Sequence, residues 1–436
     1  MAKQSSLIPQ RNPGLPEGYE ERLGYRQWVT PQSLAAAPIH RWFVFPHSFG
    51  RELVWALMDE WGLGPGDHIL DPFVGAGTTL LAAKERGIPA TGVDLSPLAA
   101  FVSQTKLADH SVVNLLKAKK RISKRFREGS PKVTASGNGF LGKCFSPEVY
   151  SGLLALKQAV LREPQENIRN FFLLGLLAIL KDFSLAVRDG GWLRWQPRKI
   201  DATEILPRFE NQISKMLADL YAAKFKSTSE RYPVFIGDAR ALEINGKFSA
   251  VITSPPYPNR HDYSRIFNVE LCFAFLNESE VKRLRHESFR SHVEAKKYEK
   301  YNTSVFPDSL KILIGKLKEQ RPDRRVVPML MGYFQDIYYT FCSLKQVLKD
   351  GAKLAFVVGN VRYKGEMVEV DDILAYLAQR AGYSWLKSWV VRYRGNSAQQ
   401  MGIYGRAAAR ESVVMLQLGH DYRSPENVTN PAPQVL

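Results

Sequence analysis

Short, nearly continuous apolar runs along this chain are separated by longer stretches in which apolar residues recur at helical spacing. The runs predict buried strands at 68–70, 90–93, 233–236, 249–252, 351–359, 384–393 and 412–418. The stretches between them predict helices, for example at 80–86, 332–348 and 371–381. Strands alternating with helices are typical of an α/β fold with a mostly parallel sheet, and the last two strands are expected to form an antiparallel C-terminal hairpin.

Shifts in composition divide the chain into an α/β unit and several additions. Residues 1–39 are rich in Pro, Gly, Gln and Ser, which predicts an extended arm that packs only near its end. We expect the α/β unit in two halves, 40–110 and 232–420, with a mostly helical insertion at 111–231 between them. A second insertion, rich in Lys and Arg, is expected at about 280–325, and a tail at 421–436.

Charge and cysteine content narrow the class of partner. Lys and Arg outnumber Asp and Glu by 60 to 43, so the formal net charge is +17, and we expect an anionic partner, nucleic acid first. The three cysteines have no metal-ligand spacing, which fits a reducing cytoplasm and predicts no metal site. The most apolar run, 171–180, is too short to span a bilayer, so it predicts a buried helix and no membrane partner.

A glycine turn follows the first predicted strand. Asp71 is followed by Phe73, Gly75, Gly77 and Thr78, and then by a helix. Strand, Gly-x-Gly turn and helix, in that order, let a ligand approach the backbone beside a helix N-terminus. The second predicted strand ends in Asp94, at the distance expected for a carboxylate that binds a ribose.

The fourth predicted strand runs into Thr253-Ser254-Pro255-Pro256-Tyr257. Two consecutive prolines have no N–H to donate, so the strand cannot continue its ladder and must give way to a rigid loop. Ligands of open α/β sheets bind at the carboxyl ends of the strands. This loop is therefore a candidate reaction site.

Residues 67–96 closely resemble the cofactor-binding motifs of S-adenosylmethionine-dependent DNA amino-methyltransferases. Residues 45–49, Phe-Pro-His-Ser-Phe, are similar to the segment that helps hold the methionine end of that cofactor. The resemblance implies a seven-stranded Rossmann-like methyltransferase sheet with S-adenosylmethionine as cofactor. One departure from a dinucleotide fold matters, because Thr78-Thr79 replaces the third glycine that would admit a pyrophosphate. The residues expected to bind the cofactor are Phe49, Asp71, Phe73, Gly75, Gly77, Thr78, Asp94 and Asp238.

Residues 253–257 resemble the catalytic motif of the same family. Members with Ser in the second position here mostly methylate cytosine N4, and those with Asp or Asn mostly methylate adenine N6. The lone pair of an exocyclic amine is delocalised into the base, so hydrogen bonds accepted by the Ser254 oxygen and a Pro255 carbonyl would localise it. A ring at Tyr257 would stack on the extracted base. No Pro-Cys stands at this position, which argues against methylation of cytosine carbon 5. The residues expected to be catalytic are Ser254, Pro255, Pro256 and Tyr257.

The resemblance implies a site-specific enzyme that forms N4-methylcytosine in duplex DNA by base flipping and direct in-line transfer, as part of restriction-modification. A cognate restriction endonuclease is then a candidate partner. An adenine-N6 DNA methyltransferase and a catalytically silent nucleic-acid-binding protein are the alternatives. The basic stretch at 117–127 leaves two interpretations open, a phosphate-contacting helix and a solvated surface helix. The candidate DNA-binding residues are Arg188, Arg194, Arg260, Arg394, Asn396, Gln399 and Gln400.

Overall fold

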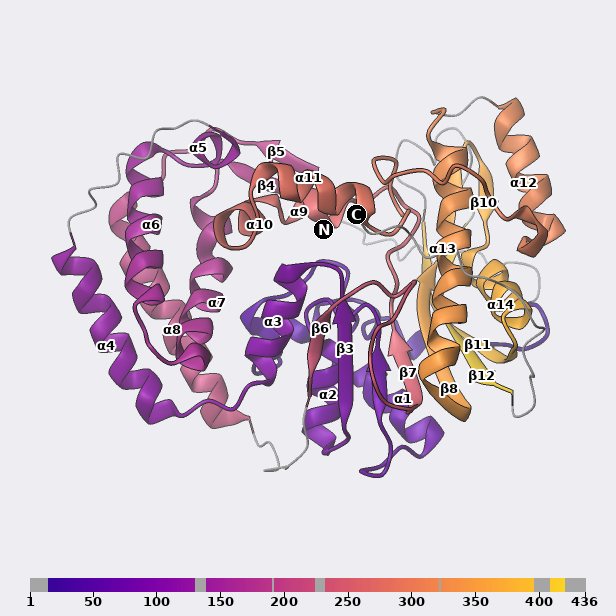
Figure 1. Ribbon diagram of the computed structural model, residues 1–436, viewed down its shortest axis with the longest axis horizontal. Coiled ribbons are helices and arrows are strands. Elements are labelled where there is room, and N and C mark those ends of the chain that lie inside the picture. The colour runs from indigo at the N-terminus through magenta and orange to yellow at the C-terminus, as the bar shows by residue number, and fades with distance from the viewer. Residues whose placement is uncertain are drawn as a thin grey trace, which may run out of the picture.

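The computed structural model describes residues 15–129, 139–189, 192–223, 232–320, 323–395 and 408–419. These residues build a central sheet of eight strands in the order β1-β11-β12-β8-β7-β2-β3-β6 (Figure 1). Strands β6, β3, β2, β7 and β8 run parallel, and β12 is antiparallel to both β8 and β11. The strands are β1 (Tyr19–Glu21), β2 (Ile69–Asp71), β3 (Ala90–Asp94), β6 (Val234–Ile236), β7 (Phe248–Thr253), β8 (Leu348–Gly359), β11 (Tyr383–Arg394) and β12 (Ala409–Leu418).

The predicted α/β class and the antiparallel hairpin are confirmed, but the expected count of seven strands is wrong. The eighth strand, β1, comes from the N-terminal arm and pairs in parallel with β11, with Tyr19 opposite Ser388. Backbone bonds flank the pair, from Ser388 N to Gly18 O (3.0 Å) and from Arg22 N to Val390 O (2.8 Å). The arm therefore packs earlier than the sequence indicated. Besides this backbone pairing, polar side-chain contacts hold the strand, from the Tyr19 hydroxyl to Asp372 and from the Tyr393 hydroxyl to Glu21 (2.9 Å), so a short strand without an apolar pattern is retained.

Helices cover both faces of the sheet, and the strands alternate between them. On β8, Ala355 and Val357 pack toward α1 (Arg51–Trp61), α2 (Thr78–Arg86) and α3 (Pro97–Leu107). Phe356 and Val358 pack toward α12 (Asp308–Glu319), α13 (Val326–Val347) and α14 (Val370–Arg380). Side chains that alternate between two apolar layers explain why the strands read as continuous apolar runs.

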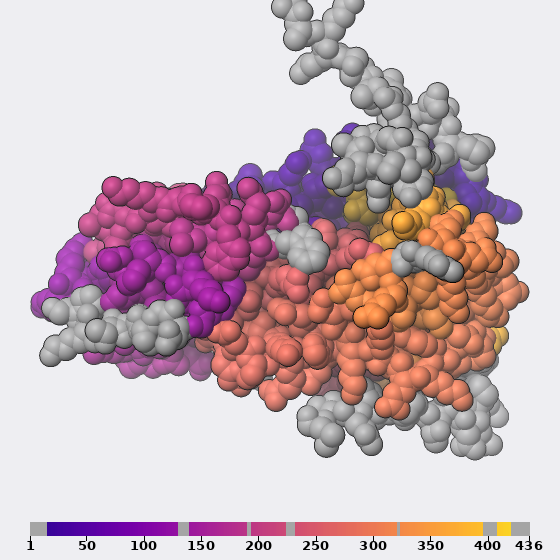
Figure 2. All heavy atoms as spheres, turned by 90° about the horizontal axis from the view of Figure 1, so that it is seen from above, coloured from indigo at the N-terminus to yellow at the C-terminus, as the bar shows by residue number. Residues whose placement is uncertain are grey.

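A helical lobe stands beside the sheet, at the left of Figure 1 and at one end of the molecule in Figure 2. Its apolar side chains belong to the same hydrophobic core as those of α1, α2 and α3. The 171–180 run lies in α7, and none of the described helices is long and apolar enough to cross a membrane. The lobe consists of α4 (Val112–Glu128), α5 (Phe140–Cys144), α6 (Pro147–Leu161), α7 (Glu166–Phe183), α8 (Ile205–Ala222) and the hairpin of β4 (Ala186–Asp189) and β5 (Trp192–Trp195).

The remaining short elements lie between the larger ones along the chain. They are α9 (Tyr263–Ile266), α10 (Asn268–Ala274), α11 (Glu278–Glu287), the hairpin of β9 (Val361–Tyr363) and β10 (Glu366–Val368), and 3-10 turns at Leu23–Tyr25, Ser33–Ala35, His40–Trp42, Ala202–Glu204 and Thr303–Val305. From β2 the chain adds β3 and β6 on one side, and it then returns to add β7 and β8 on the other side of β2. The direction in which strands are added therefore changes between β2 and β7. The carboxyl ends of β2 and β7 therefore border the crevice where ligands of such sheets bind.

Candidate active site

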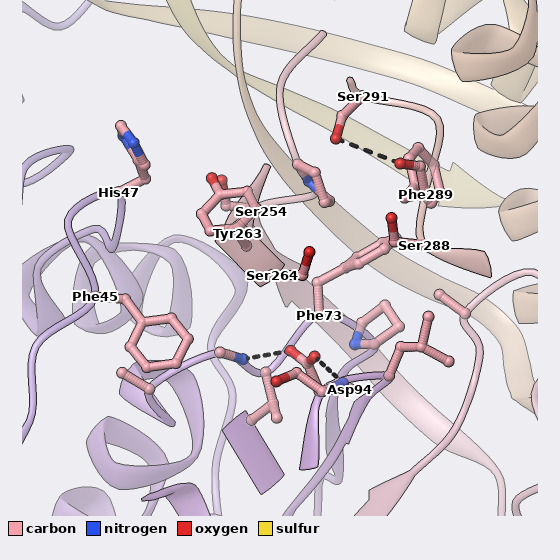
Figure 3. Close-up of a pocket in the computed structure, with 18 of the residues that line it drawn as sticks. Phe45, His47, Phe73, Asp94, Ser254, Tyr263, Ser264, Ser288, Phe289 and Ser291 are labelled. Carbon is pink, nitrogen blue, oxygen red and sulfur yellow. Dashed lines mark hydrogen bonds between the residues drawn. The ribbon is translucent and has the colours of Figure 1, made fainter. Parts of the chain in front are cut away.

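One large cavity opens at the carboxyl ends of β2, β3, β6 and β7 (Figure 3). It holds about 1210 Å³ of empty volume, open solvent at its mouth included. Most of the predicted site residues come together here. Those that line it are Phe49, Asp71, Phe73, Gly75, Thr78, Asp94, Asp238, Ser254 and Pro256.

Asp94 organises the floor of the cavity. Its carboxylate accepts hydrogen bonds from Gly75 N (3.0 Å) and Ser96 N (2.9 Å). Burial raises the pKa of Asp94, and the two amides act against that rise. Gly77 does not line the cavity. Its φ is +80°, and a Cβ there would lie 2.9 Å from Ser103 Oγ, so its role is to let the turn pack against α3.

Asp71 joins the ends of β2 and β7. Its side chain is buried and accepts hydrogen bonds from Thr253 Oγ1 (2.6 Å) and Phe73 N (3.1 Å). The first bond ties the glycine turn directly to the residue before Ser254. Burial raises the pKa of Asp71 to about 6, although both hydrogen bonds favour the charged form.

Replacing Asp71 with Asn should change how stability depends on pH. A folded pKa of about 6, above the usual 3.8, means that the Asp71 contribution is fully present below pH 3.8 and is lost as the pH rises through 6. Relative to wild type, Asp71→Asn should therefore gain stability between pH 4 and 7, by at most about 3 kcal/mol. Urea unfolding of both proteins across this range measures the difference, and a difference that stays constant with pH would contradict the assignment.

A buried lysine holds the segment before α1 against the glycine turn. Lys106 Nζ, on α3, donates to the carbonyl oxygens of His40 (3.0 Å), Phe43 (2.7 Å) and Ala76 (2.9 Å). An ammonium group has three N–H donors, one for each carbonyl. Burial lowers the pKa of this amine to about 7. The segment leads into residues 45–49, of which Phe45, His47, Ser48 and Phe49 line the cavity.

The proline loop after β7 presents Ser254 at the cavity wall. Ser254 Oγ donates to the Val357 carbonyl oxygen on β8 at 3.0 Å. Tyr257 and Pro255 do not line the cavity. The Tyr257 hydroxyl instead donates to Glu411 Oε1 on β12 at 3.2 Å. The loop is thus anchored to two strands of the C-terminal half of the sheet.

Asp238 lies at the cavity with a strong partner. Its carboxylate accepts from Arg240 Nε (2.9 Å) and Nη2 (2.6 Å), in a bidentate pair. Arg240 also donates to the buried Asp336 on α13 (3.2 Å). The Asp238–Arg240 pair is therefore fixed to the helical layer formed by α12, α13 and α14. The expected contact of Asp238 with an adenine amino group stays a prediction.

One wall of the cavity was missed by sequence reasoning. It comes from the Lys- and Arg-rich insertion and from α9. These segments are highly charged or very short, so apolar residues do not recur in them at a regular spacing. Figure 3 shows Ser254, Tyr263, Ser264 and Phe73 among the residues that line the cavity. The only sequence signal was the direct continuation of this segment from the proline loop. The missed lining residues include Asp262, Tyr263, Ser264, Phe267, Leu284, Ser288, Phe289, Ser291 and His292.

The lining fits S-adenosylmethionine. Phe45, Phe73 and Phe289 supply apolar surface for a flat base, while Asp94 and Asp238 supply acceptors for hydroxyl and amino groups. Gly75 has φ +51°, a left-handed backbone that favours glycine, and it lines the cavity, so a ligand can approach its backbone. Over the ranges that the structure describes, no group of three His, Cys, Asp or Glu side chains is placed to hold a metal ion.

Two of the candidate DNA-contacting arginines are on the β4–β5 hairpin. Arg188 points into the protein, where it pairs with the buried Glu270 and lies 4.4 Å from the centre of the Phe267 ring. These contacts favour a structural role. Arg194 is mostly exposed and pairs only with Asp189 (3.0 Å) among the described residues. Contact of either side chain with DNA stays a prediction.

The other candidates surround the proline loop. Arg260 has a left-handed backbone, φ +69°, and its guanidinium lies 5.6 Å from the centre of the Tyr363 ring. Arg394 lies 5.7 Å from the centre of the Tyr257 ring. Both arginines therefore border the proline loop. Asn396, Gln399 and Gln400 lie outside the described residues.

The basic helix α4 has partners within the lobe. Arg125 bonds the buried Glu163 (2.6 Å), and Arg121 binds the same carboxylate. Lys119 bonds Ser214 Oγ (2.9 Å) on α8. These contacts favour a solvated surface helix over a helix dedicated to phosphate contacts.

Comparison with known proteins identifies the family. The type II methyltransferase M.BsoBI from Geobacillus stearothermophilus is 30% identical over 448 residues, covering 89% of this chain and 87% of the relative. The type II methyltransferase M.AvaI from Nostoc sp. is 28% identical over 440 residues, covering 89% and 88%. M.MvaI from Kocuria varians is 19% identical over 355 residues, covering 74% and 76%.

Other comparisons carry less weight. No family model matches the sequence. Among solved structures, TrmN from Thermus thermophilus matches 84% of this chain and 48% of its own, with 11% identity and a TM-score of 0.27. That score is too low to support an argument. The full-length similarity to M.BsoBI decides the matter: the chain belongs to the type II methyltransferases, and S-adenosylmethionine is its methyl donor.

Proposed function

We propose that this protein is a site-specific DNA methyltransferase of a restriction-modification system, and that it methylates the exocyclic N4 of cytosine. The related M.BsoBI and M.AvaI are type II methyltransferases that align along nearly the whole chain. The net charge of +17 suits a polyanionic substrate. Duplex DNA is the proposed substrate, and a cognate restriction endonuclease is the proposed partner in the cell.

The observation that carries the proposal is the hydrogen bond of Ser254. A serine hydroxyl has one proton and two lone pairs, and here the proton is given to Val357 O (3.0 Å). The lone pairs of Ser254 Oγ are left to accept. An exocyclic amine that donates an N–H to this oxygen has its own lone pair drawn out of conjugation with the base.

The residues around Ser254 support direct transfer to nitrogen. Pro255 and Pro256 have no N–H, so the backbone of the loop cannot fold back into a ladder with a neighbouring strand. Bound S-adenosylmethionine supplies the electrophilic methyl carbon. The Asp71–Thr253 bond (2.6 Å) holds the glycine turn and the catalytic loop in one frame, which favours alignment of the reacting atoms.

Base flipping is part of the proposal because Ser254 lies at the wall of a cavity that a stacked base cannot reach. The Tyr257 ring, directly after the prolines, is the proposed surface on which the extracted base stacks. The choice of cytosine over adenine depends on the family pattern of Ser in the position that Asp or Asn occupies in most adenine-N6 enzymes.

The proposal is tested by the identity of the methylated nucleoside. The full-length protein is incubated with S-adenosylmethionine carrying a labelled methyl group and unmethylated phage DNA, and the DNA is digested to nucleosides and separated. We expect label in N4-methylcytosine. Label in N6-methyladenine would overturn the cytosine assignment, and absence of transfer to DNA would favour a catalytically silent binding protein. A parallel reaction with RNA tests the choice of polymer.

A further inference from the structure

Glu411 contacts the catalytic loop from a distant part of the chain. It lies on β12, 154 residues after Tyr257, and only 4% of the residue is exposed. Its Oε1 accepts the Tyr257 hydroxyl proton at 3.2 Å. Burial of a carboxylate costs free energy unless the group is paired or hydrogen-bonded, so the contacts that Glu411 makes are expected to serve a purpose.

The Tyr257 ring has a prepared seat on the sheet. Gly359 on β8 lies directly opposite Glu411 on β12 in the antiparallel register. A Cβ on Gly359 would come within 3.1 Å of the Tyr257 ring and within 2.2 Å of the Arg394 guanidinium. The absence of a side chain at Gly359 therefore leaves space for both groups, and Glu411 fixes the hydroxyl end of the ring.

The charges around Glu411 suit a fixed acceptor. Arg392 Nη1 lies 3.6 Å and Arg394 Nε 3.9 Å from Glu411 Oε2, so two cations face the carboxylate. Burial and the Glu411 charge hold the pKa of Tyr257 well above its usual value. The hydroxyl of Tyr257 therefore keeps its proton and can donate it to Glu411.

Ser254 and Tyr257 are thus anchored to adjacent strands. Ser254 Oγ bonds Val357 O on β8 (3.0 Å), and the Tyr257 hydroxyl bonds Glu411 on β12 (3.2 Å). The bond to Val357 orients the Ser254 oxygen, which is the proposed hydrogen-bond acceptor. The bond to Glu411 orients the Tyr257 ring. We propose that Glu411 is a positioning residue for methyl transfer, which sets the orientation of the Tyr257 ring and, through it, the position of the target base beside Ser254. This inference rests on the proposed function.

The test compares Glu411→Ala, Glu411→Gln, Tyr257→Phe and the double variant Glu411→Ala/Tyr257→Phe in methyl transfer to unmethylated phage DNA. Loss of the anchor should lower kcat by about 10- to 100-fold with little change in KM for DNA, since the ring stays present but is misplaced. Glu411→Gln keeps an acceptor oxygen and should stay close to wild type. The double variant should be no worse than either single variant, because both remove one bond.

Two controls separate positioning from folding. Glu163→Ala removes another buried carboxylate that faces two arginines, but in the helical lobe, and should keep wild-type kcat in its folded fraction. S-adenosylmethionine affinity, measured by calorimetry, should be unchanged in every Glu411 variant, since neither Glu411 nor Tyr257 lines the cavity.

The outcomes distinguish this inference from the proposed function. Active wild type together with a wild-type kcat in Glu411→Ala would overturn the inference alone. So would additive losses in the double variant, or a Glu411→Gln variant as impaired as Glu411→Ala. A wild-type protein that transfers no methyl group to DNA would overturn both.

Discussion

Ser254→Ala is expected to lose methyl transfer by about 10²- to 10³-fold while binding S-adenosylmethionine as tightly as wild type. A preorganised hydrogen-bonding group that acts on charge developing in the transition state contributes about this much. Ser254 Oγ has its proton fixed on Val357 O (3.0 Å), so the oxygen is already aimed as an acceptor before the substrate arrives. Alanine keeps the backbone and the prolines but removes that acceptor.

Single-turnover transfer to unmethylated phage DNA measures the loss, and calorimetry measures cofactor affinity. Ser249→Ala is the matched control. Ser249 is on the same strand, β7, and its hydroxyl accepts from His68 N (2.8 Å) at the opposite end of that strand. It should lose some stability and no activity. If Ser254→Ala lost cofactor affinity in parallel with turnover, Ser254 would act on the cofactor and not on the amine.

The positions of most strands along the chain, the glycine turn and the proline loop could be predicted from the sequence because each has a local cause. Strands that are covered on both faces, such as β8, are continuous apolar runs. Gly77 and the prolines predict turns because their own backbone geometry favours them. Strand β1 has no such local cause. Its three residues are held by the edge of β11, and nothing in their pattern indicates that edge.

The candidate site divides in the same way. Asp71 and Asp94 end parallel strands, and Asp238 and Ser254 come just after parallel strands. Parallel topology brings all four to one edge of the sheet, so their meeting was predictable. Leu284 and Phe289 reach the cavity because of the way an irregular insertion folds. That insertion has no regular spacing of apolar residues from which its fold could be predicted. The pairing of Tyr257 with Glu411 spans 154 residues and depends on the antiparallel placement of β12, so the sequence alone could not indicate it.

Lys106→Met should destabilise the protein by about 3–5 kcal/mol and also weaken S-adenosylmethionine binding. Methionine retains the apolar stem but leaves the buried carbonyls of His40, Phe43 and Ala76 without this donor, and an unsatisfied buried polar group costs about 1–3 kcal/mol. Urea unfolding gives the first effect. Calorimetric titration of the folded protein gives the second.

Lys84→Met distinguishes a weakened pocket from a weakened fold. Lys84 is a second buried lysine, on α2, and bonds Leu107 O (2.6 Å) and Asp109 (3.0 Å), neither of which lines the cavity. Its loss should cost comparable stability yet leave cofactor affinity unchanged. Lys106 differs because its three carbonyls belong to the two segments that enclose the cavity, 40–49 and the glycine turn. Equal affinities in the two variants would mean that these segments hold their positions without it, and that Lys106 serves the fold alone.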